Sequence, residues 1–179
     1  MRRRRLLGLF GVAGAAPWAG LAAASPGFDV QDWNRQHAQP PVDWVDLQGG
    51  RWSLPSLKGR AVLLNFWASW CEPCRTEMPA LQALADRERE RLAVLAINLK
   101  ETSEAIARFV HNTGLSLPVV RDVQGDIAKA WGIRIYPSTV LIDTEGRARS
   151  VVRGALDWAG PEGERLWQPL LQPQRARKR

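Results

Sequence analysis

Apolar residues gather in short runs along the middle of the chain, and their spacing predicts alternating strands and helices. Residues 61–68 and 92–98 are continuous apolar runs of strand length, which is typical of strands buried on both faces of a sheet. Between them, Leu81 and Leu84 stand at helical spacing and predict a helix from about residue 71 to 91. A helix between two such strands predicts a parallel β-α-β unit.

The second half of the body continues this alternation. Residues 102–112 predict an amphipathic helix, residues 117–122 a short strand and residues 125–131 a short helix. Residues 138–154 predict two strands joined by a tight turn, and therefore an antiparallel pair. A last helix is expected over residues 161–171. These elements predict the α/β class, with a mixed central β-sheet flanked by helices.

The segments before and after this body have different patterns. Two short alternating segments joined at Gly49 and Gly50 predict a hairpin ahead of the central strands. Residues 25–41 are polar and irregular, and we expect a linker there. The predicted domain therefore spans residues 42–171, and residues 172–179 form a basic tail without apolar pattern.

The first 24 residues have the three zones of an export signal. Four arginines at residues 2–5 precede a mostly apolar stretch at residues 6–21, and three alanines at residues 22–24 provide a cleavage site. The pattern predicts a signal peptide that delivers the domain outside the cytoplasm, in a bacterium to the periplasm. An uncleaved segment that tethers the domain to the inner membrane is the alternative. Sec and twin-arginine export both stay open.

The basic charge of the chain is concentrated at its ends. Of 25 basic residues, eight lie in the first five and last five positions, which leaves 17 basic against 18 acidic residues in between. A nucleic-acid-binding protein needs a basic stripe on its folded body. The charge pattern therefore argues against a nucleic-acid partner.

The two cysteines of the chain, Cys71 and Cys74, lie where the first predicted strand gives way to a helix. Unpaired amides and the positive end of the helix dipole favour a thiolate at Cys71. Cys74 lies one turn on, close enough to attack a mixed disulfide at Cys71. The pair predicts a redox-active disulfide, with Cys71 as nucleophile and Cys74 as resolving thiol. The cycle requires no cofactor.

Two neighbouring thiols can also bind a metal, form a structural disulfide or include a peroxidatic cysteine. Structural zinc needs four ligands, and beyond the thiols the chain offers only His37 and His111, so we predict no metal site. A structural disulfide would close too small a loop to restrict the unfolded chain. A peroxidatic cysteine usually has Thr or Ser three residues earlier, where this chain has Ala68. Copper(I) needs only two soft ligands, so copper binding stays open.

Three stretches together resemble the TlpA/ResA-type thioredoxin-like family: NFWASWCEPCRTEMP at residues 65–79, WGIRIYPSTVLIDTEGRARSVVRGALDW at residues 131–158, and SLPSLKGR at residues 53–60. Proteins of this family are exported bacterial thiol-disulfide oxidoreductases, several of them reductants in cytochrome c maturation. The resemblance runs over residues 42–171. It implies a thioredoxin fold with an N-terminal β-hairpin and an inserted helix, which residues 102–112 fit.

The resemblance also implies roles for residues near the dithiol. Pro137 matches a cis-proline whose loop packs against the dithiol and pairs with an incoming peptide, and Tyr136 borders that substrate groove. Glu77 matches a glutamate that tunes thiol acidity and relays protons. Because Asn65 stands where thioredoxin has a buried aspartate, Glu77 is the candidate internal base. The alternative for Glu77 is a solvated glutamate on the helix surface.

Two residues beside Cys71 complete the expected site. Trp70 is expected to shield Cys71 and to offer an apolar surface to substrates. Glu72 adds negative charge, which opposes the thiolate and favours a reductant. Packing roles alone are expected for the other tryptophans, namely Trp33, Trp44, Trp52, Trp67, Trp131, Trp158 and Trp167.

The sequence thus predicts an exported protein-disulfide reductase that is a monomer and works by dithiol exchange. Its expected partners are proteins with disulfides or thiols, such as apocytochrome c or a copper-site protein, and a membrane protein that donates electrons. Two alternatives use the same thiols. One is a copper-binding or copper-site assembly factor, and the other is an oxidant that forms disulfides.

Overall fold

The computed structural model describes residues 27–36 and 38–172. The predicted signal peptide, His37 and all but the first residue of the basic tail lie outside the described residues. No helix in the described part of the chain is both long and apolar enough to cross a membrane.

Six strands of the described chain form one mixed sheet in the order β1-β8-β7-β4-β5-β6. They are β1 (Asp29–Asp32), β4 (Ala61–Trp67), β5 (Leu92–Leu99), β6 (Val119–Asp122), β7 (Ser138–Ile142) and β8 (Ala148–Arg153). Strand β5 is parallel to both β4 and β6, whereas β7 is antiparallel to β4 and β8, and β8 to β1. The parallel β-α-β unit and the later antiparallel pair are therefore confirmed.

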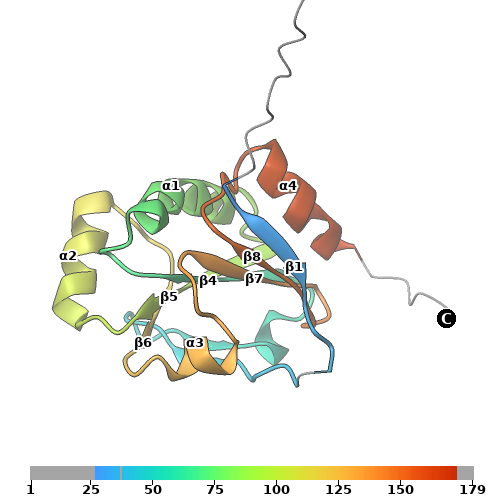
Figure 1. Ribbon diagram of the computed structural model, residues 1–179, viewed down its shortest axis with the longest axis horizontal. Coiled ribbons are helices and arrows are strands. Elements are labelled where there is room, and N and C mark those ends of the chain that lie inside the picture. The colour runs from blue at the N-terminus through green and yellow to red at the C-terminus, as the bar shows by residue number, and fades with distance from the viewer. Residues whose placement is uncertain (1–26, 37, 173–179) are drawn as a thin grey trace, which may run out of the picture.

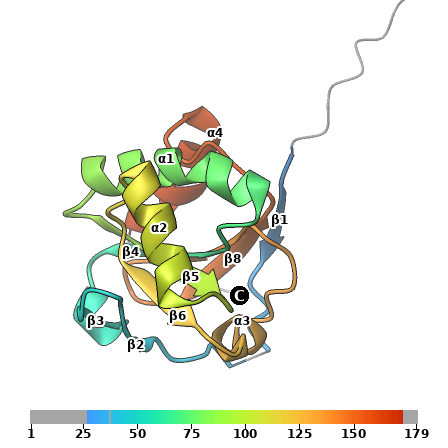
Figure 2. The same cartoon turned by 90° about the vertical axis from the view of Figure 1, so that its left-hand side faces the viewer.

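Helices cover both faces of this sheet. They are α1 (Glu72–Arg87), α2 (Ser103–Thr113), α3 (Asp126–Ala130) and α4 (Pro161–Trp167), which continues into the 3-10 helix η2 (Gln168–Leu171). Figure 1 and Figure 2 show α1 and α4 on one face, and α3 on the other. The N-terminal hairpin, β2 (Asp43–Val45) with β3 (Arg51–Ser53), lies on the α3 side and is followed by the 3-10 helix η1 (Pro55–Leu57). The predicted α/β class is confirmed.

Helix α1 ends at Arg87, four residues earlier than predicted. The amides of Arg91 and Leu92 both donate to the carbonyl of Glu88, which closes a turn before β5. Residues 88–91 are all charged, so a further helical turn would bury no apolar side chain.

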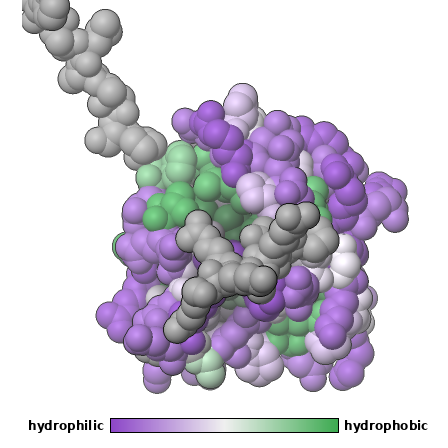
Figure 3. Space-filling view, turned by 90° about the vertical axis from the view of Figure 1, so that its right-hand side faces the viewer, coloured by the Kyte–Doolittle hydropathy of each residue, from purple (hydrophilic) through white to green (hydrophobic). Residues whose placement is uncertain are grey.

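Strand β1 lies within the segment that we expected to be an irregular linker. All four of its residues are exposed, because it is an edge strand with little covering either face. It is held by backbone pairing with β8, from Asp29 opposite Arg153 to Asp32 opposite Ser150. Such a strand carries no apolar alternation, so the sequence pattern did not reveal it. The face that bears β1 and α4 is mostly hydrophilic (Figure 3).

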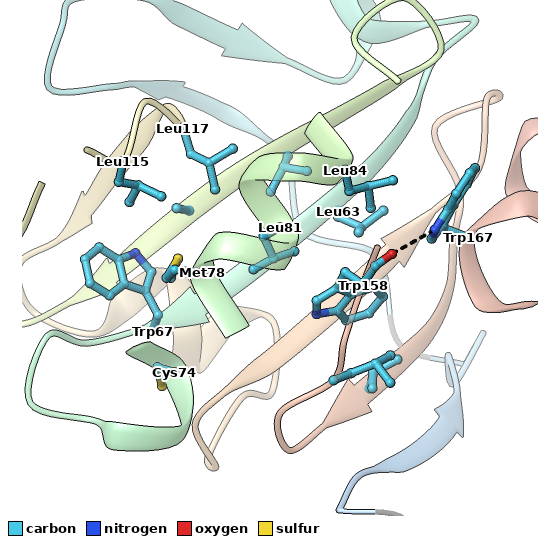
Figure 4. Packing of buried hydrophobic residues seen from close by; sticks show 14 of the residues in the cluster. Leu63, Trp67, Cys74, Met78, Leu81, Leu84, Leu115, Leu117, Trp158 and Trp167 are labelled. Carbon is cyan, nitrogen blue, oxygen red and sulfur yellow. Dashed lines mark hydrogen bonds between the residues drawn. The ribbon is translucent and has the colours of Figure 1, made fainter. Parts of the chain in front are cut away.

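The alternation along the strands divides the core into two clusters, one on each face of the sheet. Leu63 and Trp67 of β4 point toward α1, and Leu64 and Phe66 point toward α3. Figure 4 shows Leu63, with Leu81 and Leu84 of α1 and with Trp158 and Trp167 from the C-terminal part of the domain. The cluster under α1 also contains Cys71 and Cys74, so the dithiol is part of the buried core on this face of the sheet.

Gly154, just after β8, lies close to the backbone of the residues before β1, and its replacement tests this close approach. Gly154 has a φ of +96°, and an added Cβ would lie 2.4 Å from the carbonyl oxygen of Gly27. Gly132 has a φ of +68° but no heavy atom within 4 Å of that position. We expect Gly132→Ala to lower the free energy of unfolding by about 1–2 kcal/mol through backbone strain. Gly154→Ala should lose a further 1–3 kcal/mol or so, because the backbone at Gly27, just before β1, must move.

Urea unfolding of the two variants measures this difference. Equal losses for Gly132→Ala and Gly154→Ala would contradict the close packing of Gly27 on Gly154.

Candidate active site

The dithiol lies at the junction of β4 and α1. Strand β4 ends at Trp67, and Cys71 is the N-cap of α1, with its Sγ accepting a hydrogen bond from the amide of Cys74 at 3.3 Å. Cys71 and Cys74 are joined by a disulfide. Cys71 is 7% exposed and Cys74 is completely buried. An external sulfur can therefore approach only the Cys71 side of the bond.

The residues that flank Cys71 face solvent. The side chain of Trp70 is 66% exposed, which leaves an indole surface beside the dithiol. Glu72 is exposed and forms an ion pair with Arg75 at 3.2 Å. This partner offsets part of the negative charge that we expected Glu72 to bring to Cys71.

The loop before β7 reaches the same edge of the sheet. Phe66 at the end of β4 lies opposite Ser138 at the start of β7, so residues 68–71 and the loop ending at Pro137 leave the sheet side by side. The peptide bond between Tyr136 and Pro137 is cis, as expected, and the carbonyl of Pro137 accepts from the amide of Gly154 at 2.9 Å. The backbone nitrogen of Pro137 has no hydrogen to donate, as in any proline.

Tyr136 is half-buried and packs against both core clusters. Burial, followed by the charge of Asp122, raises the pKa of its hydroxyl, so Tyr136 stays neutral at any physiological pH. The neighbouring Ile135 is 55% exposed. Together with Trp70, it makes the surface on this edge of the sheet partly apolar.

Glu77 lies one turn after Cys74 on α1, and its side chain is buried. Its side chain is 3% exposed, so it is not the solvated helix glutamate of the alternative interpretation. Oε1 accepts from Asn65 Nδ2 at 2.7 Å, and Oε2 accepts from the amide of Leu156 and from Trp158 Nε1, both at 3.2 Å. Desolvation outweighs these three donors and raises the pKa of Glu77 from 4.5 to about 7. A carboxyl group with this pKa can give and take protons near neutral pH.

Asn65 joins Glu77 to the sheet. It lies on β4 opposite Thr139 of β7, and its Nδ2 also donates to Thr139 Oγ1 at 3.0 Å. The side chain is completely buried. The buried polar network thus runs from the loop after β8, through Glu77 and Asn65, to β7.

A second carboxylate holds the loop that carries Trp70 and Cys71. Glu101, just after β5, accepts from the amide of Ser69 at 2.7 Å and from the Ser69 hydroxyl. It also accepts from Asn98 Nδ2 at 2.7 Å. These contacts attach the active-site loop to the neighbouring parallel strand.

Removing this carboxylate should destabilise the fold. We expect Glu101→Ala to lower the free energy of unfolding by roughly 2–3 kcal/mol, because it leaves partly buried donors of Ser69 and Asn98 without their charged acceptor. Glu90→Ala is the matched control, since that glutamate is exposed in the turn after α1. Urea unfolding that shows equal losses for the two variants would contradict the role of Glu101.

Several of these residues were not expected from the sequence. Trp158 was assigned to packing, yet its indole donates to Glu77 across 81 residues of sequence. The position of Glu101 could have been inferred from the sequence, because it follows a buried parallel strand. The carboxyl ends of neighbouring parallel strands lie at the same edge of a sheet, which is where the dithiol lies. For Trp158 and Leu156 no local pattern exists, since their partner lies on another element.

The dithiol has no third metal-ligating side chain beside it in the part of the chain that the structure describes. Within it, no three His, Cys, Asp or Glu side chains gather as a group that could hold a metal ion. His111 is exposed on α2.

This chain is similar to known proteins in sequence and in fold. The thiol-disulfide oxidoreductase ResA of Bacillus thuringiensis subsp. konkukian (strain 97-27) is 36% identical over 111 residues, which are 62% of this chain and 64% of ResA. The chain therefore spans less than two thirds of the length of this relative. StoA from Bacillus subtilis superposes with a TM-score of 0.59 at 26% identity, over 65% of this chain and 90% of StoA.

A thiol:disulfide interchange protein of the thioredoxin family from Chlorobium tepidum TLS superposes with a TM-score of 0.67 at 25% identity, over 76% of this chain and 97% of that protein. These neighbours confirm the thioredoxin-like fold with its inserted helix, α2. The family model described as the AhpC/TSA family matches residues 26–151. The resemblance to ResA-type thioredoxin-like proteins is thus confirmed, and the chain belongs to the AhpC/TSA family.

Proposed function

We propose that this protein is a thiol-disulfide oxidoreductase that reduces disulfides in other proteins through Cys71 and Cys74. The observation that carries this proposal is the asymmetry of the pair, since Cys71 caps α1 and is partly accessible while Cys74 is fully buried. This asymmetry assigns attack to one sulfur and resolution to the other. The similarity to ResA, which is named a thiol-disulfide oxidoreductase, agrees with it.

The proposed cycle begins with both cysteines reduced. The Cys71 thiolate attacks one sulfur of a substrate disulfide, so a bond forms between Cys71 and that sulfur while the other substrate sulfur leaves as a thiolate. Cys74 then loses its proton and attacks Cys71 Sγ, which releases the second substrate thiolate. Two electrons have passed to the substrate, and the protein is left with the Cys71–Cys74 disulfide.

Glu77 is the proposed acceptor of the Cys74 proton. It lies three residues after Cys74 on α1, and burial holds the pKa of its carboxyl at about 7. A base of this strength can take a proton from a thiol at neutral pH and return it in a later step.

Partners are proposed from the same chemistry. The exposed indole of Trp70 and the apolar side chain of Ile135 suit an unfolded or extended polypeptide that presents a disulfide. Export by residues 1–24, an electron donor in the membrane, and substrates such as apocytochrome c belong to this proposal. Tyr136 is the proposed side wall of the substrate groove.

The direction of exchange is tested by the reduction potential of the domain, measured in glutathione or dithiothreitol buffers. Fluorescence of Trp67 and Trp70 should report the change. We expect a value well below about −200 mV, since a dedicated reductant must hold its electrons more weakly than its substrates do. A value near −120 mV or so would mark the protein as an oxidant and contradict the proposed direction.

A further inference from the structure

The carboxamide of Asn65 is hydrogen-bonded at one end only. Its Nδ2 donates to Glu77 Oε1 at 2.7 Å and to Thr139 Oγ1 at 3.0 Å. Its Oδ1 is buried and has no hydrogen-bond partner among the residues that the structure describes. Because Asn65 is completely buried, the orientation of the amide is set by these two contacts rather than by solvent.

Both groups that accept from Asn65 can also donate. A carboxyl group accepts when ionised and gains one O–H donor when protonated, and a threonine hydroxyl can do either. The two ends of a carboxamide have nearly the same size, so a half-turn about χ2 exchanges donor for acceptor without changing the packing. Each orientation makes two hydrogen bonds with Glu77 and Thr139. The half-turn exchanges an unpaired Oδ1 for an unpaired NH₂, so the match between the Glu77 O–H and Oδ1 must outweigh that exchange.

We propose that the Asn65 carboxamide turns by a half-turn when Glu77 changes its protonation state. Next to the carboxylate, Nδ2 donates to Glu77 and Thr139, as the structure has it. Next to the carboxylic acid, Oδ1 accepts from Glu77 Oε1–H and from the Thr139 hydroxyl. Asn65 is therefore a positioning residue that keeps Glu77 hydrogen-bonded in both states.

The functional part of this inference rests on the proposed function. When Cys74 gives its proton to Glu77, the proton is held in the Oε1–H bond directed at Asn65 Oδ1, and the amide turns back when the proton leaves. An aspartate at position 65 could not serve in this way, because two carboxyl groups at this distance would share one proton. The neutral amide leaves the proton on Glu77.

The surroundings of Glu77 contain few other ionisable groups. The strands β4 and β7 bring none, since residues 61–67 and 138–142 include no ionisable side chain. The loop after β8 brings Asp157, which is exposed, and α1 brings Cys74 and Cys71. The groups that act on the Glu77 carboxyl are the three neutral donors and its own burial. Its protonation is thus free to follow pH or the dithiol.

The test is NMR spectroscopy of the oxidised, ¹³C- and ¹⁵N-labelled protein between pH 5 and pH 9 or so. The Glu77 carboxyl carbon reports protonation, and the side-chain NH₂ of Asn65 reports the amide. We expect both signals to titrate with the same midpoint. Contacts between the Asn65 NH₂ protons and Thr139 should be strong at high pH and lost at low pH.

Two variants sharpen the result. Glu77→Gln offers a permanent donor, so the Asn65 signal should become independent of pH and stay at its low-pH position. Asp86→Asn removes an exposed carboxylate from the same helix and should leave the titration unchanged. An Asn65 signal that does not move while the Glu77 carbon titrates would overturn the inference, as would a Glu77 carbon that does not titrate.

Failure of the proposed function would look different. If the Asn65 signal titrates as expected but the reduced protein does not reduce insulin, the turn of the amide is supported and the proposed exchange activity is wrong. If insulin is reduced and the Asn65 signal stays fixed, the exchange activity stands and the inference falls.

Discussion

Replacing Cys71 by serine should abolish the reduction of insulin disulfides, with a loss of roughly a thousandfold or more. A serine hydroxyl is not ionised at neutral pH, whereas the nucleophile in disulfide exchange is a thiolate. The remaining thiol cannot replace it, because Cys74 is completely buried and Cys71 is the partly accessible member of the pair. The measurement is the rate of insulin reduction with dithiothreitol as electron source.

The variant Cys74→Ser separates the two roles. It keeps the nucleophile but lacks the resolving thiol, so it should accumulate mixed disulfides with its substrates, visible as higher bands on a non-reducing gel. Thr76→Ala is a matched control on the exposed face of α1 that keeps both thiols and the active-site loop. Normal turnover by the Cys71→Ser protein would rule out Cys71 as the nucleophile.

The variant Glu77→Gln should change how stability depends on pH. In the folded protein, the pKa of Glu77 is raised from 4.5 to about 7, so between these values the folded state binds more protons than the unfolded state. The free energy of unfolding therefore falls as pH rises through this window, by roughly 3 kcal/mol in total. Below the window both states are protonated, and above it both are ionised. Glutamine does not titrate, so the variant should lack this decline.

The quantity to measure is the difference in unfolding free energy between Glu77→Gln and the unaltered protein, from urea titrations of the oxidised forms. Other groups titrate alike in both proteins and cancel. We expect the difference to move in favour of the variant by roughly 3 kcal/mol from pH 4 to pH 8. A difference that stays flat with pH would show that Glu77 titrates normally.

The same variant tests the role of Glu77 in exchange. The pH profile for alkylation of Cys71 by iodoacetamide should shift in Glu77→Gln, because a titrating carboxyl group has left the neighbourhood of the dithiol. Overlapping profiles would remove Glu77 from the mechanism while leaving the stability prediction intact.

Most of the secondary structure follows from local pattern, for a physical reason. The runs at β4 and β5 are apolar because both faces of those strands are buried. A strand buried on both faces is recognisable in the sequence as a continuous run of apolar residues. Helix α2 is also recognisable from local sequence, and its N-cap Thr102 accepts from the amide of Ala105 at 3.2 Å. Strand β1 was not predicted from the sequence, because it is held by backbone pairing with β8 rather than by burial of apolar side chains.

Some residues of the candidate site could likewise be predicted from the sequence, and others could not. Cys71 and Cys74 could be named from sequence because their chemistry depends on residue type and spacing, and Pro137 and Glu77 because the motifs around them resemble those of a known family. The sequence alone left open whether Glu77 is solvated or buried. That choice depends on Leu156 and Trp158, which reach it from a loop about eighty residues away.

The sequence by itself thus determined the α/β class, the order of the main elements after residue 42 and the redox pair, because each depends on neighbouring residues. Only the tertiary structure decided the burial of Glu77, the orientation of Asn65 between Glu77 and Thr139, and the attachment of Ser69 to Glu101. These are contacts between side chains on different elements. Their strength comes from exclusion of water, and a linear pattern does not specify which distant segments exclude water together.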